Sequence, residues 1–395
     1  MLPLLREKRI IPNFLILTWG DEGGPLVEFL GGNGITFQAV PCHPTSTERV
    51  RWILECVAGI QPDIFVPNLV VPAYYASRWV RSTGIPTVGV LHSDDPFYRG
   101  IQEEFFLGDP RYAVSALVCV SRKLEEQVAG KNSRHTRVLR IPYGVPIPPV
   151  KIHSFRPPAL RIAYVGRLAE EQKRISLVTR ALCRVVREVA DTEAVLYGDG
   201  PERDQVELIL QSEGAGLPVR LAGRIPSQEI QTHLQDCDVV ILLSDYEGLP
   251  IALLEAMACG CVPVCLRMRS GIPELVQDGV TGLLVEDRDK GFVEAIRRLR
   301  GNPDFLAELS ANARAKVKEE FSIEANADAW AALLTELAEK SSGKRAIRIP
   351  HRIKLPPVHP ALAAEDPREE TMSLAKAFSG KMRKSLGLLK RCLRS

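Results

Sequence analysis

The amino-acid sequence predicts an α/β fold in which two doubly wound domains are followed by a basic C-terminal extension. Three observations support this prediction. Short runs rich in Val, Ile and Leu alternate with helical segments over residues 1–340, and the runs lack strict apolar–polar alternation, as is typical of parallel strands buried on both faces. The proline-rich residues 141–150 interrupt this pattern, which then restarts. A chain of 395 residues has room for two such domains.

The first domain is expected over residues 1–150. Its first strand, residues 14–18, is interpreted as buried and not as part of a signal peptide. The apolar run there is short, contains Pro12, and is followed by a glycine-rich acidic loop in place of a cleavage site. The expected strands are residues 14–18, 36–40, 64–66, 87–91, 117–120 and 138–141, with helices near 48–58, 71–82 and 122–129.

The second domain is expected over residues 151–340, closed by a helix over residues 323–339. Ligands of doubly wound sheets bind at the carboxyl ends of the strands, so these ends are expected to line a cleft between the two domains. The expected strands are residues 161–165, 194–197, 219–221, 239–242, 262–265 and 283–285. The other expected helices lie near residues 174–190, 201–213, 227–236, 250–259, 291–300 and 303–319.

The composition is that of a globular protein, with 45% apolar and 25% charged residues. It excludes collagen-like structure, wholesale disorder and a many-pass membrane protein, and no uncharged apolar run of about 18 residues predicts a spanning helix. Cys119, Cys237, Cys261 and Cys265 lie in or beside apolar segments and are expected to be buried free thiols. A reducing, cytoplasmic location therefore fits the chain best, and no cysteine–histidine spacing predicts a metal site.

The net charge of +3 is the sum of two unlike parts. Residues 340–395 carry 14 Lys and Arg against four Asp and Glu, a net of +10, which leaves 37 against 44 in residues 1–339, a net of −7. Residues 341–370, rich in proline and charge, are predicted to be a flexible linker, the start of a basic extension over residues 341–395.

Residues 371–395 carry seven basic residues and no acidic one, with apolar residues at helical spacing. A basic amphipathic helix favours an anionic membrane surface as partner, which places the protein peripherally at the inner face of the membrane. The alternatives left open are a helix packed on the body or on a partner, and a disordered basic tail. Nucleic acid is not expected, because no aromatic platform accompanies the charges. The apolar positions are Leu374, Phe378, Met382, Leu386, Leu389 and Leu393.

Four motifs of the second half place polar residues at strand ends or helix starts. The run VGRL at 165–168 ends a strand with Arg167, and Lys173 follows six residues later. The run YGDGP at 197–201 leads through glycines into a helix, and LAGR at 221–224 ends another strand. The fourth motif, SDYEGLPIALLEAM, starts at Ser244 and holds one acid, Glu247, in a loop and another, Glu255, on the following helix.

Together these residues suit a nucleotide-diphosphate sugar. Breaking the bond between sugar and diphosphate builds negative charge, which Arg167 and Lys173 can stabilise without a metal, helped by glycine N–H groups. Carboxylates accept hydrogen bonds from hydroxyl pairs, so Glu247 is expected to hold the sugar and Glu255 the ribose. Each motif alone is common, since a Gly-x-Gly is usually a turn and a lone cation is usually solvated. Their combination and order predict the donor site.

The run from residue 161 to residue 286 resembles glycosyltransferase family 4, a group of retaining transferases with the GT-B fold. The resemblance rests on VGRL with Lys173, YGDGPERDQ, LAG, SDYEGLPIALLEAMACG and DGVTGLLV. It is strong over about 160–340 and weak over 10–150. It implies two Rossmann-like domains facing across a cleft and a nucleotide-sugar donor held mainly by the second. It also implies metal-independent transfer with retention of anomeric configuration, without a further cofactor.

The resemblance also implies individual roles. Arg167 and Lys173 would contact the donor diphosphate, Glu255 the ribose and Glu247 the transferred sugar. Glu247, His92, Arg167 and Lys173 are the expected catalytic residues. The other expected donor contacts are Gly23, Gly24, Gly198, Gly223, Arg224, Gly248, Leu249, Pro250 and Leu253.

The first half carries fewer landmarks of the family. Gly23 and Gly24 lie in a loop after the first strand, where the family keeps glycines near donor and acceptor; a simple turn is the alternative. His92 follows the strand 87–91, where the resemblance places a histidine facing sugar or acceptor; a structural histidine is the alternative. Tyr143 stands where the family usually has asparagine, a departure whose effect the sequence does not show.

The leading hypothesis is a retaining glycosyltransferase of hexosyltransferase type. It would move a sugar from a nucleotide-diphosphate donor to a glycan, a lipid-linked sugar or a small molecule. A catalytically silent GT-B protein that binds a nucleotide sugar or a partner is the alternative from another class, and a sugar-nucleotide epimerase is a third reading. The intact Arg167, Lys173, Glu247 and Glu255 favour catalysis. The sequence names neither the base, the sugar nor the acceptor.

Overall fold

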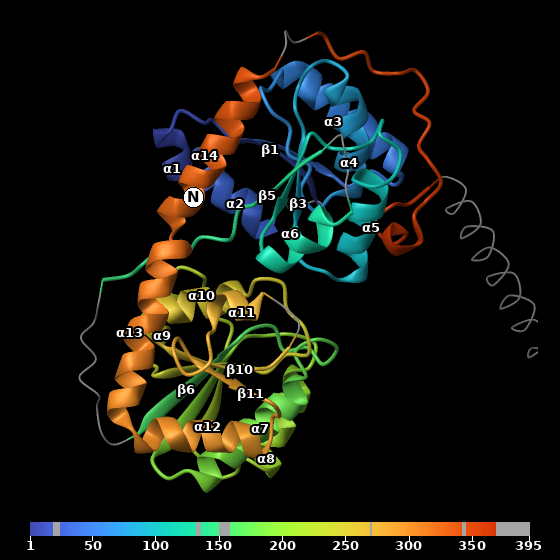
Figure 1. Ribbon diagram of the computed structural model, residues 1–395. Coiled ribbons are helices and arrows are strands. Elements are labelled where there is room, and N and C mark those ends of the chain that lie inside the picture. The colour runs from blue at the N-terminus through green and yellow to red at the C-terminus, as the bar shows by residue number, and fades with distance from the viewer. Residues whose placement is uncertain (19–23, 132–135, 150–158, 269–270, 342–344, 369–395) are drawn as a thin grey trace, which may run out of the picture. The chain divides into compact units, whose positions relative to one another are not determined.

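The computed structural model describes residues 1–18, 24–131, 136–149, 159–268, 271–341 and 345–368 (Figure 1). The chain forms two compact units. The C-terminal unit comprises residues 1, 119–126 and 140–330, and the N-terminal unit comprises residues 2–118, 127–139 and 331–395. Both are built of short strands and helices in alternation, which confirms the predicted α/β class. The expected basic helix within residues 371–395 lies outside the described residues.

The C-terminal unit contains a six-stranded sheet with the strand order β11-β10-β9-β6-β7-β8. Every pair in it is parallel. In this order the chain starts in the middle of the sheet, runs to one edge, and returns to fill the other half, so β6 and β9 flank the switch point. The strands are β6 (Leu160–Val165), β7 (Thr192–Tyr197), β8 (Val219–Gly223), β9 (Val239–Leu242), β10 (Val262–Leu266) and β11 (Leu283–Val285).

Helices cover both faces of this sheet (Figure 1). α7 packs against α8 and α12 on one face, and α10 packs against α9 and α13 on the other. Because both faces are covered, the strands read as continuous apolar runs, and their side chains fill one core together with α7 and α12. The helices are α7 (Ile175–Glu188), α8 (Arg203–Ser212), α9 (Ile230–Leu234), α10 (Ile251–Ala258), α11 (Ile272–Leu275), α12 (Lys290–Gly301) and α13 (Pro303–Glu320). The next helix is α14 (Ile323–Glu339), whose residues 331–339 belong to the N-terminal unit.

The N-terminal unit holds two smaller sheets. β1 (Asn13–Thr18) pairs in parallel with β2 (Thr36–Pro41), and β3 (Val88–Leu91), β4 (Ala116–Cys119) and β5 (Arg137–Arg140) form the second sheet in that order. β3 and β4 are buried throughout, as predicted. β1 and β2 are partly exposed, which the prediction of strands buried on both faces missed.

The strand expected over residues 64–66 is reduced to one bridge between Phe65 and Thr87. Pro62 and Pro67 enclose this segment. Because proline has no N–H to donate, a longer ladder cannot form there, and the prediction of a full strand was wrong.

The helices of the N-terminal unit include three that the sequence reading did not predict. α3 (Ser46–Ile60) and α4 (Val71–Arg81) match expected segments, and so does α6 (Arg122–Ala129), whose residues 122–126 belong to the C-terminal unit. The additional helices are α1 (Leu2–Glu7), α2 (Gly24–Gly32) and α5 (Pro96–Phe105). α5 carries a start signal that reveals it, since Asp95 accepts a hydrogen bond from the Tyr98 N–H (3.0 Å) and proline occupies the first helical position.

A C-terminal strap (residues 345–368) packs on the N-terminal unit, where the sequence predicted a flexible linker. The Arg345 N–H donates to the Thr83 carbonyl (2.9 Å) at its start, and the Ser46 N–H donates to the Pro367 carbonyl (2.8 Å) at its end. Leu362 lies fully buried in a short 3₁₀ turn against α5. The linker prediction failed because a few apolar and charged groups, too sparse to form a periodic pattern, fix the strap.

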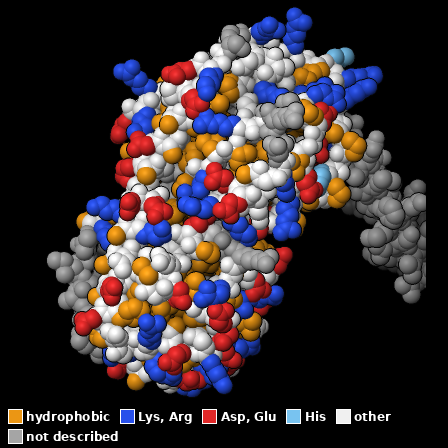
Figure 2. Space-filling view, viewed as in Figure 1, with side chains coloured by type: hydrophobic (Ala, Val, Ile, Leu, Met, Phe, Trp, Pro, Cys, Tyr) orange, Lys and Arg blue, Asp and Glu red, His pale blue; other side chains and the backbone are white. Residues whose placement is uncertain are grey.

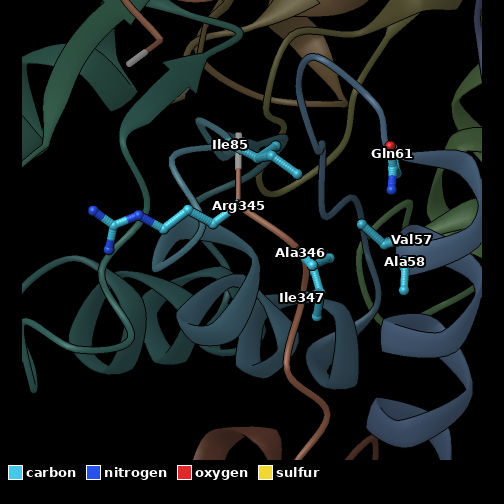
Figure 3. Close-up of a pocket in the computed structure, with 7 residues that line it drawn as sticks. All are labelled: Val57, Ala58, Gln61, Ile85, Arg345, Ala346 and Ile347. Carbon is cyan, nitrogen blue, oxygen red and sulfur yellow. The ribbon is translucent and has the colours of Figure 1, made fainter. Parts of the chain in front are cut away.

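Figure 3 shows the start of the strap beside α3. Strap residues 345–347 run past Val57 and Ala58, and the side chain of Arg345 points away from the helix. The space enclosed between them is only about 50 Å³. Since a ligand pocket needs roughly 300 Å³ or more, this contact is packing and not a binding site.

The surface and the thiols complete the description. Acidic and basic side chains are interspersed over the visible face of the C-terminal unit (Figure 2). Cys119, Cys237, Cys261 and Cys265 are buried free thiols, as predicted. Among the described residues, no helix combines the length and the apolar character needed to span a membrane.

Candidate functional site

The candidate site is built on two loops that leave neighbouring strands at the switch point of the C-terminal unit. β6 and β9 pair in parallel, so their carboxyl ends meet at the same edge of the sheet. The loop after β6 carries Arg167 and Lys173, and the loop after β9 carries Glu247. The Asp245 N–H donates to the Gln172 carbonyl (3.0 Å), which joins the two loops directly.

Lys173 and Glu247 form an ion pair in which Lys173 Nζ lies 2.6 Å from Glu247 Oε1. The side chains are 17% and 8% exposed, so the pair is largely shielded from water. Charge-assisted hydrogen bonds of this kind are among the stronger polar contacts in proteins. The structure thus brings together two of the four expected catalytic residues and balances their charges.

An open depression of about 680 Å³ lies beside these loops, at the carboxyl ends of β6, β7 and β8. Four of the expected donor-binding residues line it: Arg167, Gly198, Arg224 and Glu255. Its size is that of a small-molecule site. The sequence reading did not single out Ile225, Ser227 and Ile230, which give it apolar and hydroxyl surface and carry no motif of their own.

Glycines let the backbone approach closely in this depression. Gly198 has a φ of +155°, and a Cβ there would lie 1.9 Å from the Gly166 carbonyl oxygen, so no other residue fits. Gly223 also has a positive φ, of +78°. The Gly198 N–H donates to the Gly223 carbonyl (2.8 Å), so these two glycines let the ends of β7 and β8 pack closely beside the depression that Gly198 lines.

α10 positions the remaining residues of the SDYEGLPIALLEAM motif. Leu249, Pro250 and Leu253 are buried, so packing is what their side chains contribute. The Gly248 carbonyl accepts a hydrogen bond from the Gly271 N–H (2.9 Å), which fixes the loop before the helix. Glu255 projects from α10 into the depression. Burial raises the pKa of the Glu255 carboxyl above its ordinary value.

Replacing Glu255 by glutamine is expected to have opposite effects on binding and on stability. The charged carboxylate is disfavoured in the folded protein, so E255Q should raise the free energy of unfolding at pH 7, and the gain should vanish below about pH 4. Loss of a charged acceptor should weaken nucleotide binding about 10–100-fold. Urea unfolding across pH and calorimetric titration with UDP and GDP measure the two effects. E188Q, at an exposed pair on α7, is the control.

Three of the expected site residues, Gly23, Gly24 and His92, belong to the N-terminal unit. Gly24 begins α2 with a φ of +67°, whereas Gly23 lies outside the described residues. His92 follows the end of β3, and its Nε2 lies 2.7 Å from Asn68 Oδ1, so the imidazole donates to the amide oxygen. Burial lowers the pKa of His92 to about 4, so the ring is neutral at physiological pH.

The low pKa of His92 predicts a contribution to acid lability. Between pH 6.5 and 4 the unfolded chain binds a proton at this histidine and the folded protein does not, so stability is lost as the pH falls through this window. H92Q should remove about 1–2 kcal/mol of that loss, after allowance for partial exposure of the ring. Urea unfolding at pH 4.5 and 7 measures the difference, and equal losses in both proteins would contradict it.

No group of three or more His, Cys, Asp or Glu residues suited to a metal occurs in the described part of the chain. The structure shows further polar residues that the motifs did not indicate. Arg174 and Arg288 each pair with Asp245, two residues before Glu247, and Asn68 contacts His92. Their only sequence signal is proximity to an expected residue, and Arg288 has none.

Comparison with known proteins decides the family. Residues 151–316 match the model of the glycosyl transferases group 1. WcaL of Escherichia coli K12, assigned to colanic acid biosynthesis as a glycosyltransferase, is 34% identical over 320 residues, which cover 72% of this chain and 75% of WcaL. The chain belongs to the group 1 glycosyltransferases. This confirms the resemblance at the level of the group 1 glycosyltransferases.

Other relatives of this group 1 glycosyltransferase match over shorter segments. The amylovoran biosynthesis glycosyltransferase AmsK of Erwinia amylovora is 36% identical over 171 residues, or 41% of each chain. The match to the alpha-D-kanosaminyltransferase of Streptomyces kanamyceticus is 29% identical and covers 45% of each chain. The chain therefore spans less than half the length of these curated relatives.

Solved structures support the fold. Anabaena HepE, solved in complex with UDP, has a TM-score of 0.64 at 18% identity and covers 82% of this chain and 99% of its own. The lipopolysaccharide outer core galactosyltransferase WaaB has a TM-score of 0.62 at 16% identity and covers 82% and 100%. At these identities the likeness concerns the fold, and it confirms the predicted GT-B class.

Proposed function

We propose that this group 1 glycosyltransferase is a retaining, metal-independent family 4 enzyme. It would move a sugar from a nucleotide-diphosphate donor to a carbohydrate or lipid-linked acceptor. The observation that carries the proposal is the shielded Lys173–Glu247 pair at the switch point, beside a depression lined by Arg167 and Glu255. HepE has been solved in complex with UDP-glucose, and a mannosyltransferase of Mycolicibacterium smegmatis, 31% identical over 180 residues, is named as dependent on GDP-mannose.

The residues suit the chemistry of the transfer. The bond between the anomeric carbon and the diphosphate oxygen breaks, and the diphosphate departs with the electron pair. The acceptor hydroxyl oxygen bonds to that carbon and gives its proton to the departing diphosphate. Arg167 and Lys173 supply positive charge where negative charge develops, and this is the interaction that accelerates such a step. Glu247 and Glu255 accept hydrogen bonds from sugar and ribose hydroxyls.

A thermal-shift screen tests the donor half of the proposal. UDP, GDP and ADP, each with and without glucose or mannose attached, are added to the full chain, because a ligand that binds the folded state raises its melting temperature. One nucleotide is expected to raise it selectively, and the shift should be smaller in E255Q at the same nucleotide concentration, because binding is weaker. A screen in which no nucleotide shifts the wild-type protein would contradict the proposal.

We also propose that residues 371–395 hold the enzyme at an anionic membrane surface on the cytoplasmic side. The seven basic residues and the helical spacing of the apolar residues support this proposal. The full chain and a chain ending at residue 370 are sedimented with vesicles of phosphatidylglycerol or of phosphatidylcholine. The full chain is expected to bind the phosphatidylglycerol vesicles and not the phosphatidylcholine vesicles, and the chain ending at residue 370 is expected to bind neither. Equal binding of both chains overturns the proposal.

A further inference from the structure

Four polar contacts fasten the loop over residues 170–174 to the loop over residues 243–249. Besides the Lys173–Glu247 pair and the backbone bond from Asp245 to Gln172, the Gln172 amide donates to the Tyr246 carbonyl (2.8 Å). The fourth joins Arg174 to the Asp245 carboxylate, two residues before Glu247. The two loops joined in this way carry the expected catalytic pair.

The Asp245 carboxylate is shared between two guanidinium groups. Arg174 Nε lies 2.5 Å from Asp245 Oδ2, and Arg288 bonds the other carboxylate oxygen. Arg288 Nε also donates to the Leu243 carbonyl (2.7 Å), so it holds the loop at two points. Burial acts to raise the pKa of Asp245, but the bonds from Arg174 and Arg288 outweigh it and lower that pKa, so the carboxylate stays charged. Half-exposed ion pairs stabilise a protein little, so their significance here is geometric.

Arg174 has an unfavourable backbone conformation. Its φ of 49° and ψ of 44° are left-handed, a region that a residue with a Cβ avoids and glycine adopts freely. Arg174 lies at the start of α7, directly after Lys173. A change of Arg174 to the right-handed region would rotate the peptide that joins it to Lys173 and redirect the Lys173 side chain. Strained conformations of this kind persist only where the surroundings hold them.

We propose that Asp245, itself held by Arg288, is a positioning residue that keeps Arg174 in its left-handed conformation and thereby directs Lys173 onto Glu247. The proposal rests on the function proposed for Lys173 and Glu247. It gives Asp245, Arg174 and Arg288 a role in the transfer reaction, although none of them contacts the donor in this role. Arg174 contributes both an ion pair and a left-handed backbone conformation under this proposal. Two variants of Arg174 can distinguish these contributions.

The test compares R174A with R174G. Both variants lose the ion pair with Asp245, but only alanine is penalised in the left-handed region. The kcat for release of nucleotide is measured with UDP-glucose or GDP-mannose, whichever raises the melting temperature. R174A is expected to lower kcat about tenfold with little change in KM, and R174G should keep a kcat at least fivefold above that of R174A. Equal kcat values for the two variants overturn the proposal.

Asp245 is tested in both backgrounds. D245N should lower kcat about tenfold in the wild-type chain and less than twofold further in R174G, because glycine needs no partner to hold it. Equal losses in both backgrounds overturn the proposal. Hydrogen exchange of residues 170–176 should be faster in D245N than in the wild type, which reports on the loop independently of activity. R180A, which removes an exposed pair with Glu213 on the same helix, is the control and should match the wild type.

K173A in the same assay separates the two proposals. A K173A protein as active as the wild type would refute the proposed function of the site. An inactive K173A protein with equal R174A and R174G would refute the role of Asp245 alone.

Discussion

Replacement of Lys173 by methionine is expected to lower the rate of sugar transfer about 10²–10³-fold, because it removes a cation at the point where negative charge develops on the leaving diphosphate. The same change leaves Glu247, 8% exposed, without its 2.6 Å partner. Unfolding free energy should therefore fall by about 1–3 kcal/mol. E247Q should lower the rate of sugar transfer by a similar factor. Because glutamine has the shape of glutamate but no charge, the group left without a charged partner in this variant is Lys173.

The double variant separates catalysis from stability. K173M/E247Q has no unpaired charge, so its unfolding free energy should return toward that of the wild type while its activity stays low. The matched control is K316M/E320Q on α13, which removes an exposed lysine–glutamate pair of nearly the same length, 2.7 Å, and should change neither property. A double variant that regains activity would show that the pair is structural, and the assignment of both residues would be wrong.

Removal of the C-terminal strap is expected to have the largest effect on stability. A chain that ends at residue 344 exposes the surface under Leu362 and loses Asp366, whose carboxylate accepts from the Tyr75 hydroxyl (3.2 Å) and pairs with Arg368 (2.6 Å). Burial of one leucine alone stabilises by about 1.5–3 kcal/mol. The loss should amount to about 4 kcal/mol or more, enough to unfold much of the N-terminal unit.

Two comparisons define this experiment. A chain that ends at residue 370 keeps the strap and should unfold in urea like the full chain. L362A should cost about 2–5 kcal/mol, whereas L208A, at an exposed leucine of α8, should cost less than about 0.5 kcal/mol. If the chain ending at residue 344 were as stable as the full chain, the strap would be a linker after all.

The sequence predicted the C-terminal unit better than the N-terminal unit, for physical reasons. Strands such as β9 and β10 are buried on both faces between helices, so each is an apolar run bounded by polar residues, and each lies within one or two residues of its predicted bounds. In the N-terminal unit, β1 and β2 are partly exposed and residues 64–66 are confined between prolines. Apolar runs therefore predicted the strands of the N-terminal unit less well.

The sequence predicted those residues of the candidate site that lie within short motifs, and it did not predict contacts between residues far apart in the chain. Arg167, Gly198, Arg224 and Glu255 sit in motifs at strand ends, and the structure places them around one depression. The contact between Asp245 and Arg288 joins residues 43 positions apart and leaves no periodic signal. The strap was missed for the same reason, since Asp366 meets Tyr75 across 291 positions. Tertiary partners of this kind depend on the folded chain and not on the motif that surrounds either residue.

The strap also bears on the order in which the protein is made. Residues 2–118 and 127–139 of the N-terminal unit precede most of the C-terminal unit in the chain, yet the strap over residues 345–368 that packs on them follows it. The C-terminal unit comprises no residue beyond 330. Domains generally fold as units while the chain emerges, usually from the N-terminus onward. Here the unit that is begun first is completed only after the C-terminal unit has been made, so its apolar surface at α5 stays uncovered until the strap has emerged.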